Sequence, residues 1–166
     1  MHLLTAGHET TVNLISKGML ALLRTPAALE ALRCTDRVRA ASVDEILRFD
    51  SPVQMVTRWA REDVVIGGRH IQAGQLVSLM LGSANRDEER FFRADQLELQ
   101  RFPNPHLSFG SGNHACLGAS LAKLEGRVAF ELLKHLPDLQ VEDGPISYRD
   151  SIVFHGPQSL LLTWSV

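Results

Sequence analysis

The chain has 166 residues, 45% of them hydrophobic and 22% charged, which suffices for one domain with a buried core. Its net charge of −2 gives no argument for nucleic acid or an acidic membrane surface as a partner. No apolar stretch approaches the roughly 20 residues of a membrane span, and the N-terminus lacks the layout of a signal peptide.

Helical periodicity dominates the first third of the chain. Apolar residues recur at helical spacing over residues 2–24, on more than one face and with no N-cap before them. We therefore expect the chain to begin inside a long, central and buried helix. A second helix is predicted over residues 26–33, capped by Thr25 and with proline at its first position. Ser42 opens a third, short helix that ends before Pro52.

Short strands and one more helix are predicted for the rest. Residues 53–81 partly alternate and turn at Gly67-Gly68, which is typical of antiparallel hairpins, whereas residues 82–108 are irregular. Helical spacing resumes from Leu117 to about His135. Two closing strands follow, at residues 139–141 and 160–164. This order predicts an α+β fold that is mainly α.

The run from Phe109 to Gly118 reads Phe-Gly-Ser-Gly-Asn-His-Ala-Cys-Leu-Gly. Cys116 ends this glycine-rich loop just before the helical pattern, where free backbone N–H groups and the helix dipole favour a thiolate. Gly110 and Gly112 let the backbone approach a planar ring closely. A thiolate so placed suits a soft metal ion carried in a flat cofactor.

Other roles for Cys116 are weaker. A buried, inert cysteine on a tight turn is the plain alternative. A zinc site fits poorly, because no second cysteine lies at a ligand spacing. A cysteine nucleophile would need a base, and nothing marks one of the seven histidines for that role.

The decapeptide resembles the haem-ligand loop of the cytochrome P450 family of haem-thiolate monooxygenases. The resemblance implies haem b as cofactor and Cys116 as the axial thiolate ligand of its iron, a ligand that favours O–O cleavage. It also implies that Phe109 packs over the sulfur and that His114 reaches a haem propionate. Cys34 is then expected to be a free thiol in a reducing cytoplasm. Every fixed position of the family signature is filled, by Phe109, Gly110, Gly112, His114, Cys116, Leu117 and Gly118.

A second motif, Ala6-Gly7-His8-Glu9-Thr10-Thr11, lies inside the first predicted helix. Glycine and adjacent threonines weaken a helix, and a threonine hydroxyl can bond the carbonyl four residues before it. The stretch resembles the family's oxygen-binding groove. Ala6 and Gly7 would leave room for dioxygen, Thr10 would hydrogen-bond it, and Glu9 would pass protons inward through water. The alternative is an ordinary helix with a solvated glutamate and a packed threonine.

Glu45 and Arg48 are spaced i, i+3. They could form a surface ion pair, and Glu45 also fits a capping box behind Ser42. The resemblance implies instead a buried structural pair that ties its helix to the segment before the cysteine loop. The third member of that group would be Arg101 or His106, and both are plausible.

Arg58 follows the first predicted strand segment. By resemblance it is a propionate-binding arginine that clamps the acidic edge of haem together with His114. Residues 53–56 and 152–154 would then line the substrate side, although core packing is an equally good explanation of their apolar character.

Lys123 and Arg127 lie about one helical turn apart on the helix predicted after Leu117. Such cations usually form a solvated helix face. In the family this face receives the electron donor, so a ferredoxin or flavodoxin is the expected partner.

The resemblance covers residues 1–166 as a single partial domain, the C-terminal, haem-ligating portion of a soluble bacterial cytochrome P450 whose N-terminal portion is absent. The parent reaction would insert one oxygen atom into a small organic substrate, with NAD(P)H electrons delivered by a redox partner. No nucleic-acid or membrane partner is expected. The alternative is a truncated, non-catalytic remnant that binds haem weakly or not at all.

Overall fold

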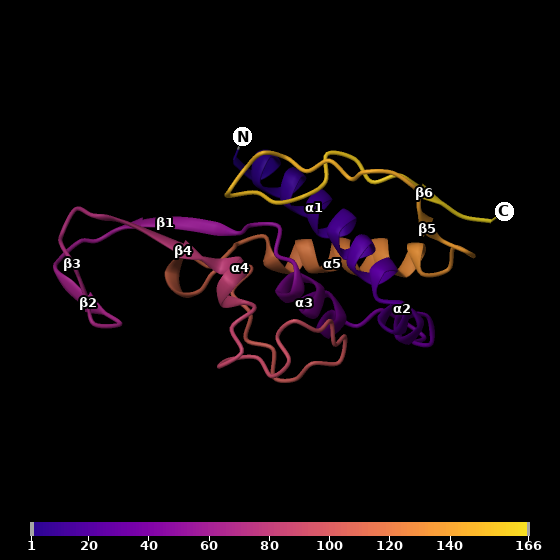
Figure 1. Ribbon diagram of the computed structural model, residues 1–166, viewed down its shortest axis with the longest axis horizontal. Helices are drawn as coiled ribbons and strands as arrows, with labels where there is room; N and C mark the ends of the chain where they lie inside the picture. Colours follow the sequence, from indigo (N-terminus) through magenta and orange to yellow (C-terminus); the bar gives the residue numbers. More distant parts are fainter. Residues whose placement is uncertain (1, 166) are drawn as a thin grey trace.

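The computed structural model describes residues 2–165. Within the first helix it describes the side chains from Ala6 onward. Helices form the body of the molecule, and the strands make three small sheets (Figure 1). The described helices are α1 (His2–Arg24), α2 (Pro26–Arg33), α3 (Ala40–Phe49), α4 (Leu81–Ala84), the 3-10 helix η1 (Gly112–His114) and α5 (Ala119–Leu133). The predicted fold class, mainly helical with small sheets, is confirmed.

Each sheet consists of two antiparallel strands. The pairs are β1 (Met55–Trp59) with β4 (Leu76–Met80), β2 (Val64–Ile66) with β3 (Arg69–Ile71), and β5 (Gln140–Val141) with β6 (Leu162–Thr163). Gly67 and Gly68 join β2 to β3 with φ of 56° and 75°, a left-handed backbone that glycine adopts without strain. The hairpin that carries β2 and β3 extends away from the helices in Figure 1. The predicted strand regions are confirmed.

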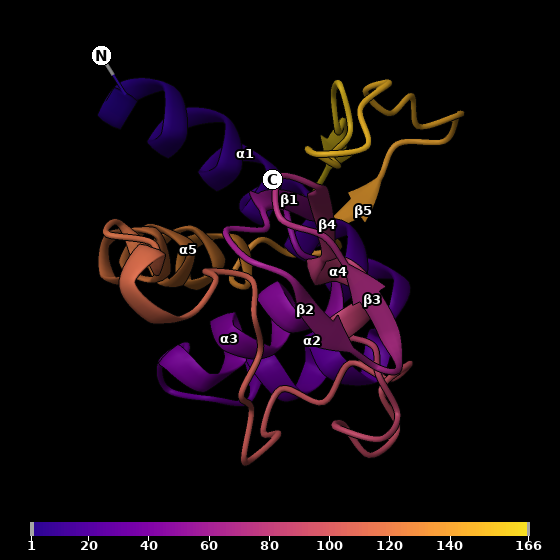
Figure 2. The same cartoon turned by 90° about the vertical axis from the view of Figure 1, so that its left-hand side faces the viewer.

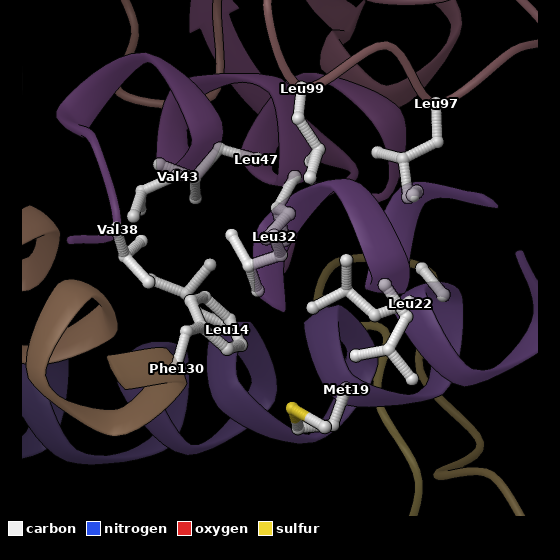
Figure 3. Packing of buried hydrophobic residues seen from close by; sticks show 14 of the residues in the cluster. Leu14, Met19, Leu22, Leu32, Val38, Val43, Leu47, Leu97, Leu99 and Phe130 are labelled. Carbon is white, nitrogen blue, oxygen red and sulfur yellow. The ribbon is translucent and has the colours of Figure 1, made fainter. Parts of the chain in front are cut away.

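The hydrophobic core lies where α1, α2, α3 and α5 meet (Figure 3). Its members include Leu14, Met19, Leu22, Leu32, Val43, Ile46 and Phe130. Two glycines let α1 and α5 cross closely. A Cβ at Gly126 would lie 3.1 Å from Leu14, and one at Gly18 would overlap the ring of Phe130. This close crossing fixes α1 relative to α5, the helix that follows the cysteine loop.

The two longest helices do not bury the faces that their periodicity suggested. In α1 burial is concentrated between Asn13 and Leu22, and residues 6–8 are exposed, so the expectation of a buried helix is wrong for its N-terminal turns. In α5 the buried residues are Gly126 and Phe130. Periodicity predicts that a helix has an apolar stripe, but it does not specify which element covers that stripe. The recurring apolar residues of the α5 region that are exposed are Leu117, Leu121, Leu124, Val128 and Leu132.

Helix boundaries need further corrections. α3 begins at Ala40 with Arg39 as its N-cap, so Ser42 lies inside the helix, where it is buried, and does not open it. Thr25 precedes α2 as predicted but makes no side-chain capping bond. The short helix α4 interrupts a segment predicted to be irregular, and α5 spans Ala119–Leu133 rather than reaching His135. No helix within residues 2–165 is both long and apolar enough to span a bilayer.

Candidate functional site

The loop before α5 closes on itself through its backbone. The N–H of Cys116 donates to the carbonyl of Phe109 at 2.8 Å, and the N–H of Ala115 donates to the carbonyl of Gly112 at 3.0 Å. Gly110 and Gly112 have φ of 69° and 75°, so their left-handed backbone favours glycine. The loop therefore holds Cys116 three residues before the first residue of α5.

The thiol of Cys116 is exposed and free of any disulfide. The alternative of a buried, inert cysteine is therefore wrong. Gly118 lies beside the thiol, since a Cβ added there would be 3.9 Å from the Cys116 sulfur. No cluster of three or more His, Cys, Asp and Glu side chains within the described chain could hold a metal ion. An exposed single cysteine on a glycine-containing loop fits a metal that arrives inside a planar cofactor, as haem iron does.

Asp44 connects α3 to α5 and to the residues just before the cysteine loop. This α3 residue lies 2.6 Å from Nζ of Lys123 on α5 and 3.1 Å from Nε2 of His106, which precedes the loop. Partial burial raises the pKa of Asp44, but the hydrogen bonds from His106 and Lys123 outweigh it, and the pKa lies below its ordinary value. The Phe109 ring packs 6.0 Å from the His106 ring and 5.7 Å from Nζ of Lys123. These contacts fix the start of the loop.

Glu45 and Arg48 form a fully buried pair. Arg48 Nε donates to Glu45 Oε2 at 2.8 Å, and Arg48 Nη2 donates to Oε1 at 2.9 Å, which makes the pair bidentate. Arg101 Nε lies 3.0 Å from Oε2 of the same carboxylate. His106 instead contacts Asp44, so of the two predicted third members it is Arg101 that meets Glu45. A capping box behind Ser42 is excluded, because Ser42 lies within the helix.

The remaining bonds of this cluster go to the segment before the cysteine loop. The N–H of Glu98 donates to Glu45 Oε1 at 2.9 Å, and Asn104 Nδ2 donates to Oε2 at 3.1 Å. Arg48 Nη1 donates to the carbonyls of Asn85 and Ala94, each at 2.8 Å. A buried ion pair is tolerated only when its remaining donors and acceptors are satisfied, and here the irregular segment supplies those partners.

Residues 6–11 of α1, here called the α1 motif, begin with an exposed stretch at residues 6–8. The Thr10 hydroxyl donates to the carbonyl of Ala6 at 2.6 Å, the i−4 bond that its sequence permitted. Gly7 is exposed, and a Cβ there would meet nothing within 4 Å. Glu9 Oε1 lies 3.1 Å from Nη1 of Arg149 near the C-terminus. No ion pair or side-chain hydrogen bond joins this motif to the cysteine loop within the described residues.

Arg58 and His114, the residues expected to bind the haem propionates, are both exposed and lie on separate elements. Arg58 lies on β1, where its Nη1 donates to the carbonyl of Thr57 at 2.8 Å. His114 ends η1. In the described part of the chain neither residue pairs with a carboxylate, so both remain available to an anionic ligand.

The structure joins the two segments predicted to line a substrate side. Val53 forms an antiparallel bridge with Phe154, and the N–H of Gln54 donates to the carbonyl of Val153 at 2.8 Å. Met55 and Val56, which continue into β1, are half-buried.

Lys123 and Arg127, the residues expected to meet the electron donor, already make contacts within the chain. Both are half-buried, Lys123 is paired with Asp44, and Arg127 Nε donates to the carbonyl of Val38 at 3.3 Å. Sequence reasoning missed Asp44 and Arg149. Asp44 carried no motif of its own, and Arg149 lies 140 residues from Glu9, so no local pattern could connect the two.

The fold is thus mainly helical and presents an exposed cysteine on a loop whose backbone is left-handed at Gly110 and Gly112. The family model described as Cytochrome P450 matches residues 37–144, more than half of the chain. The chain therefore belongs to the cytochrome P450 family.

Similar proteins are bacterial. The biotin biosynthesis cytochrome P450 of Bacillus subtilis (strain 168) is 46% identical over 160 residues, which are 96% of this chain and 40% of that protein. The polyketide biosynthesis cytochrome P450 PksS of the same strain is 44% identical over 98% of this chain and 41% of its own length. The crystal structure of P450BioI in complex with hexadec-9Z-enoic acid ligated acyl carrier protein has a TM-score of 0.94 and 45% identity, over 99% of this chain and 43% of that one. The chain thus spans about two fifths of the length of these relatives.

Proposed function

We propose that this chain is the C-terminal, haem-ligating portion of a monooxygenase. The whole enzyme would insert one atom of dioxygen into a small organic substrate, with NAD(P)H electrons delivered through a redox partner. The observation that carries this proposal is the exposed Cys116 thiol, held by its own backbone N–H on a glycine-containing loop. Membership of the family supports it.

Haem b, when bound, supplies the iron chemistry of oxygen activation. The Cys116 thiolate would be the single protein ligand of its iron. Arg58 and His114, both exposed and without a carboxylate partner, would hold the propionates by charge-assisted hydrogen bonds. Gly110 and Gly118 would let the loop lie close to the ring, and Phe109 would pack beside the sulfur.

Residues of α1 would handle oxygen and protons on the opposite side. Ala6 and Gly7 present an exposed face with little side-chain bulk. The Thr10 hydroxyl donates to the Ala6 carbonyl in this structure and would instead donate to dioxygen. Glu9 would resupply that proton from solvent, because its half-buried carboxylate lies one residue away on the same turn.

A ferredoxin or flavodoxin would dock near the N-terminal half of α5. Lys123 is already neutralised by Asp44, so Arg127 would contribute more of the long-range attraction for an acidic donor. Both cysteines are free thiols, which suits the reducing cytoplasm we propose as its location.

A second candidate is a non-catalytic remnant that binds haem weakly or not at all. One observation favours it: the α1 turn at Ala6 and Gly7 is exposed within the described residues, so no closed substrate pocket surrounds it there.

Carbon monoxide difference spectroscopy tests the thiolate. The chain is reconstituted with haem, reduced and exposed to carbon monoxide, and a strongly red-shifted Soret band is expected. Cys116→Ala and Cys116→His should abolish that band, whereas Cys34→Ala, which removes the other exposed cysteine, should leave it unchanged. A wild-type spectrum of histidine ligation would refute the proposal. NAD(P)H-dependent oxidation with a surrogate redox partner then separates the enzyme from the remnant.

A further inference from the structure

Three polar residues make a stripe along α1. Glu9, Asn13 and Lys17 follow one another at i, i+4 and i+8 and therefore share one helix face. Asn13 and Lys17 are only 2% and 1% exposed, which is unusual for such side chains. The stripe faces the C-terminal hairpin, defined here as residues 147–158.

The C-terminal hairpin is bonded internally. The N–H of Gln158 donates to the carbonyl of Ser147 at 2.8 Å, and the N–H of Arg149 donates to the carbonyl of Gly156 at 3.2 Å. The rings of Tyr148 and His155 stack with centroids 4.9 Å apart and planes at 5°. These bonds join the two arms of the hairpin, so they resist separate movement.

The tip of the hairpin reaches the proposed substrate side. The N–H of His155 donates to the carbonyl of Pro52 at 3.0 Å, and Val153 accepts the bond from the N–H of Gln54. The proposed substrate-side residues 152–154 therefore belong to the same hairpin whose stem lies against α1.

Glu9 and Asn13 of the α1 stripe contact the hairpin directly, and Lys17 contacts Asp50, which lies next to the hairpin. Glu9 pairs with Arg149 at 3.1 Å. Gly156 lies so close to Asn13 that a Cβ on the glycine would overlap the amide group. Lys17 pairs with Asp50 at 2.7 Å, and Asp50 lies 3.7 Å from Nδ1 of His155. The C-terminal segment, in yellow, crosses α1 in the view of Figure 1, and Figure 2 shows that it lies to one side of the helix.

We propose that Arg149 is a positioning residue for Glu9, and that the C-terminal hairpin couples the substrate-side residues 152–154 to the proton-relay turn of α1. A ligand that shifts the tip would shift Arg149 with it and so change where the Glu9 carboxylate is held. The assignment of a relay role to Glu9 rests on the proposed function; the mechanical coupling rests on the contacts above.

Hydrogen exchange followed by mass spectrometry tests the coupling on the chain as it stands. Glu9→Gln and Arg149→Gln should each speed exchange at the His155 amide of the hairpin and at the Gln54 amide, which bonds to the hairpin tip, by about 1.4-fold to fivefold, as expected for a half-exposed ion pair. The double variant should exchange no faster than either single variant. Arg149→Lys keeps the cation and should restore most of the protection.

Two further variants keep the test decisive. Gly156→Ala should loosen the contact between the hairpin and α1, because the new Cβ would overlap the amide of Asn13. Adding Asn13→Ala should reverse that effect, because it removes this amide. Arg93→Gln is the matched control: Arg93 is as exposed as Arg149, at 51%, and pairs with Glu98, which lies far from the hairpin in sequence. It should leave exchange at the tip unchanged.

Unchanged tip exchange in Arg149→Gln, additive effects in the double variant, or a response confined to the stem would each overturn the proposal. None of these measurements needs haem. Loss of the thiolate spectrum would therefore refute the proposed function while leaving the coupling intact, and the reverse outcome would refute the coupling alone.

Discussion

Cys34 and Cys116 are both exposed, but their surroundings differ. The Cys34 thiol lies 3.4 Å from Oε1 of Glu30, and this hydrogen bond, together with the negative charge of Glu30, raises the pKa of the Cys34 thiol. A raised pKa keeps the thiol protonated and makes it a poor metal ligand. Cys116 has no carboxylate partner among the described residues. Exposure alone therefore does not distinguish the two thiols, whereas the neighbouring carboxylate of Glu30 does.

Thr10→Ala should separate proton delivery from cofactor binding. In a polypeptide that carries the whole family fold, the variant should keep normal haem content but release more hydrogen peroxide per NAD(P)H consumed, because the hydroxyl that now donates to Ala6 no longer orders the proton. The measurement is the ratio of product and peroxide to NAD(P)H. Thr11→Ala, at the adjacent half-buried threonine, is the control and should leave coupling unchanged. Unchanged coupling in Thr10→Ala would mean that Thr10 is only a packed helix residue.

At the level of elements, the cluster around Glu45 joins α3 to the irregular segment before the cysteine loop. Glu45→Ala should cost about 3–5 kcal/mol, because it leaves the guanidinium of Arg48 buried without its counter-charge. Urea unfolding and haem content measure the loss, and we expect little holo-protein. Glu98→Gln removes a carboxylate that is 34% exposed and should cost less than about 1 kcal/mol. A Glu45→Ala variant with wild-type haem content and melting temperature would refute a structural role.

Glu131 joins α5 to the segment that follows α2. The N–H of Val38 donates to its carboxylate at 2.7 Å, and Lys134 lies 2.9 Å away. The bond from Val38, followed by the bond from Lys134, lowers the pKa of Glu131 to about 2 from an ordinary 4.5. The lowered pKa of Glu131 in the folded protein contributes stability that is fully present above about pH 4.5 and is lost as the pH falls through about 2.

Glu131→Gln should therefore lower the urea midpoint at neutral pH and show a smaller further loss on acidification than the wild type. Glu125→Gln, an exposed position on the same helix, is the control and should follow the wild-type pH profile. Parallel acid profiles for Glu131→Gln and the wild type would contradict the assigned cause.

Elements that local sequence patterns define were predicted well, whereas contacts between distant segments were not. Helices α1 and α2 and the hairpin at Gly67-Gly68 depend on local patterns and lie where expected. The choice between Arg101 and His106 depended on how the segment after α4 folds back onto α3, which no local pattern encodes. The pairing of Glu9 with Arg149 was missed for the same reason.

For the molecule as a whole, the decisive feature is apolar surface that nothing in the described chain covers. Leu121, Leu124, Val128 and Leu132 are between 51% and 68% exposed on one side of α5. Most residues of β1 and β4 are exposed as well, and an isolated two-stranded sheet is at best marginally stable. Solved relatives that match 99% of this chain extend well beyond it, since the match covers only 43% of P450BioI. In those relatives additional chain is available to cover such surfaces.

The 166 residues alone should therefore self-associate, retain haem weakly and show no coupled turnover. Each large apolar side chain left uncovered forgoes about 1.5–3 kcal/mol, and several of them together rival a typical stability margin of about 5–15 kcal/mol. Light scattering, haem stoichiometry and NAD(P)H-dependent oxidation with a surrogate redox partner are the measurements. Leu121→Gln combined with Val128→Gln should reduce self-association without unfolding the core, because both side chains are already exposed, whereas Glu125→Gln should not. A wild-type monomer with tightly held haem and coupled turnover would show that these surfaces need no cover.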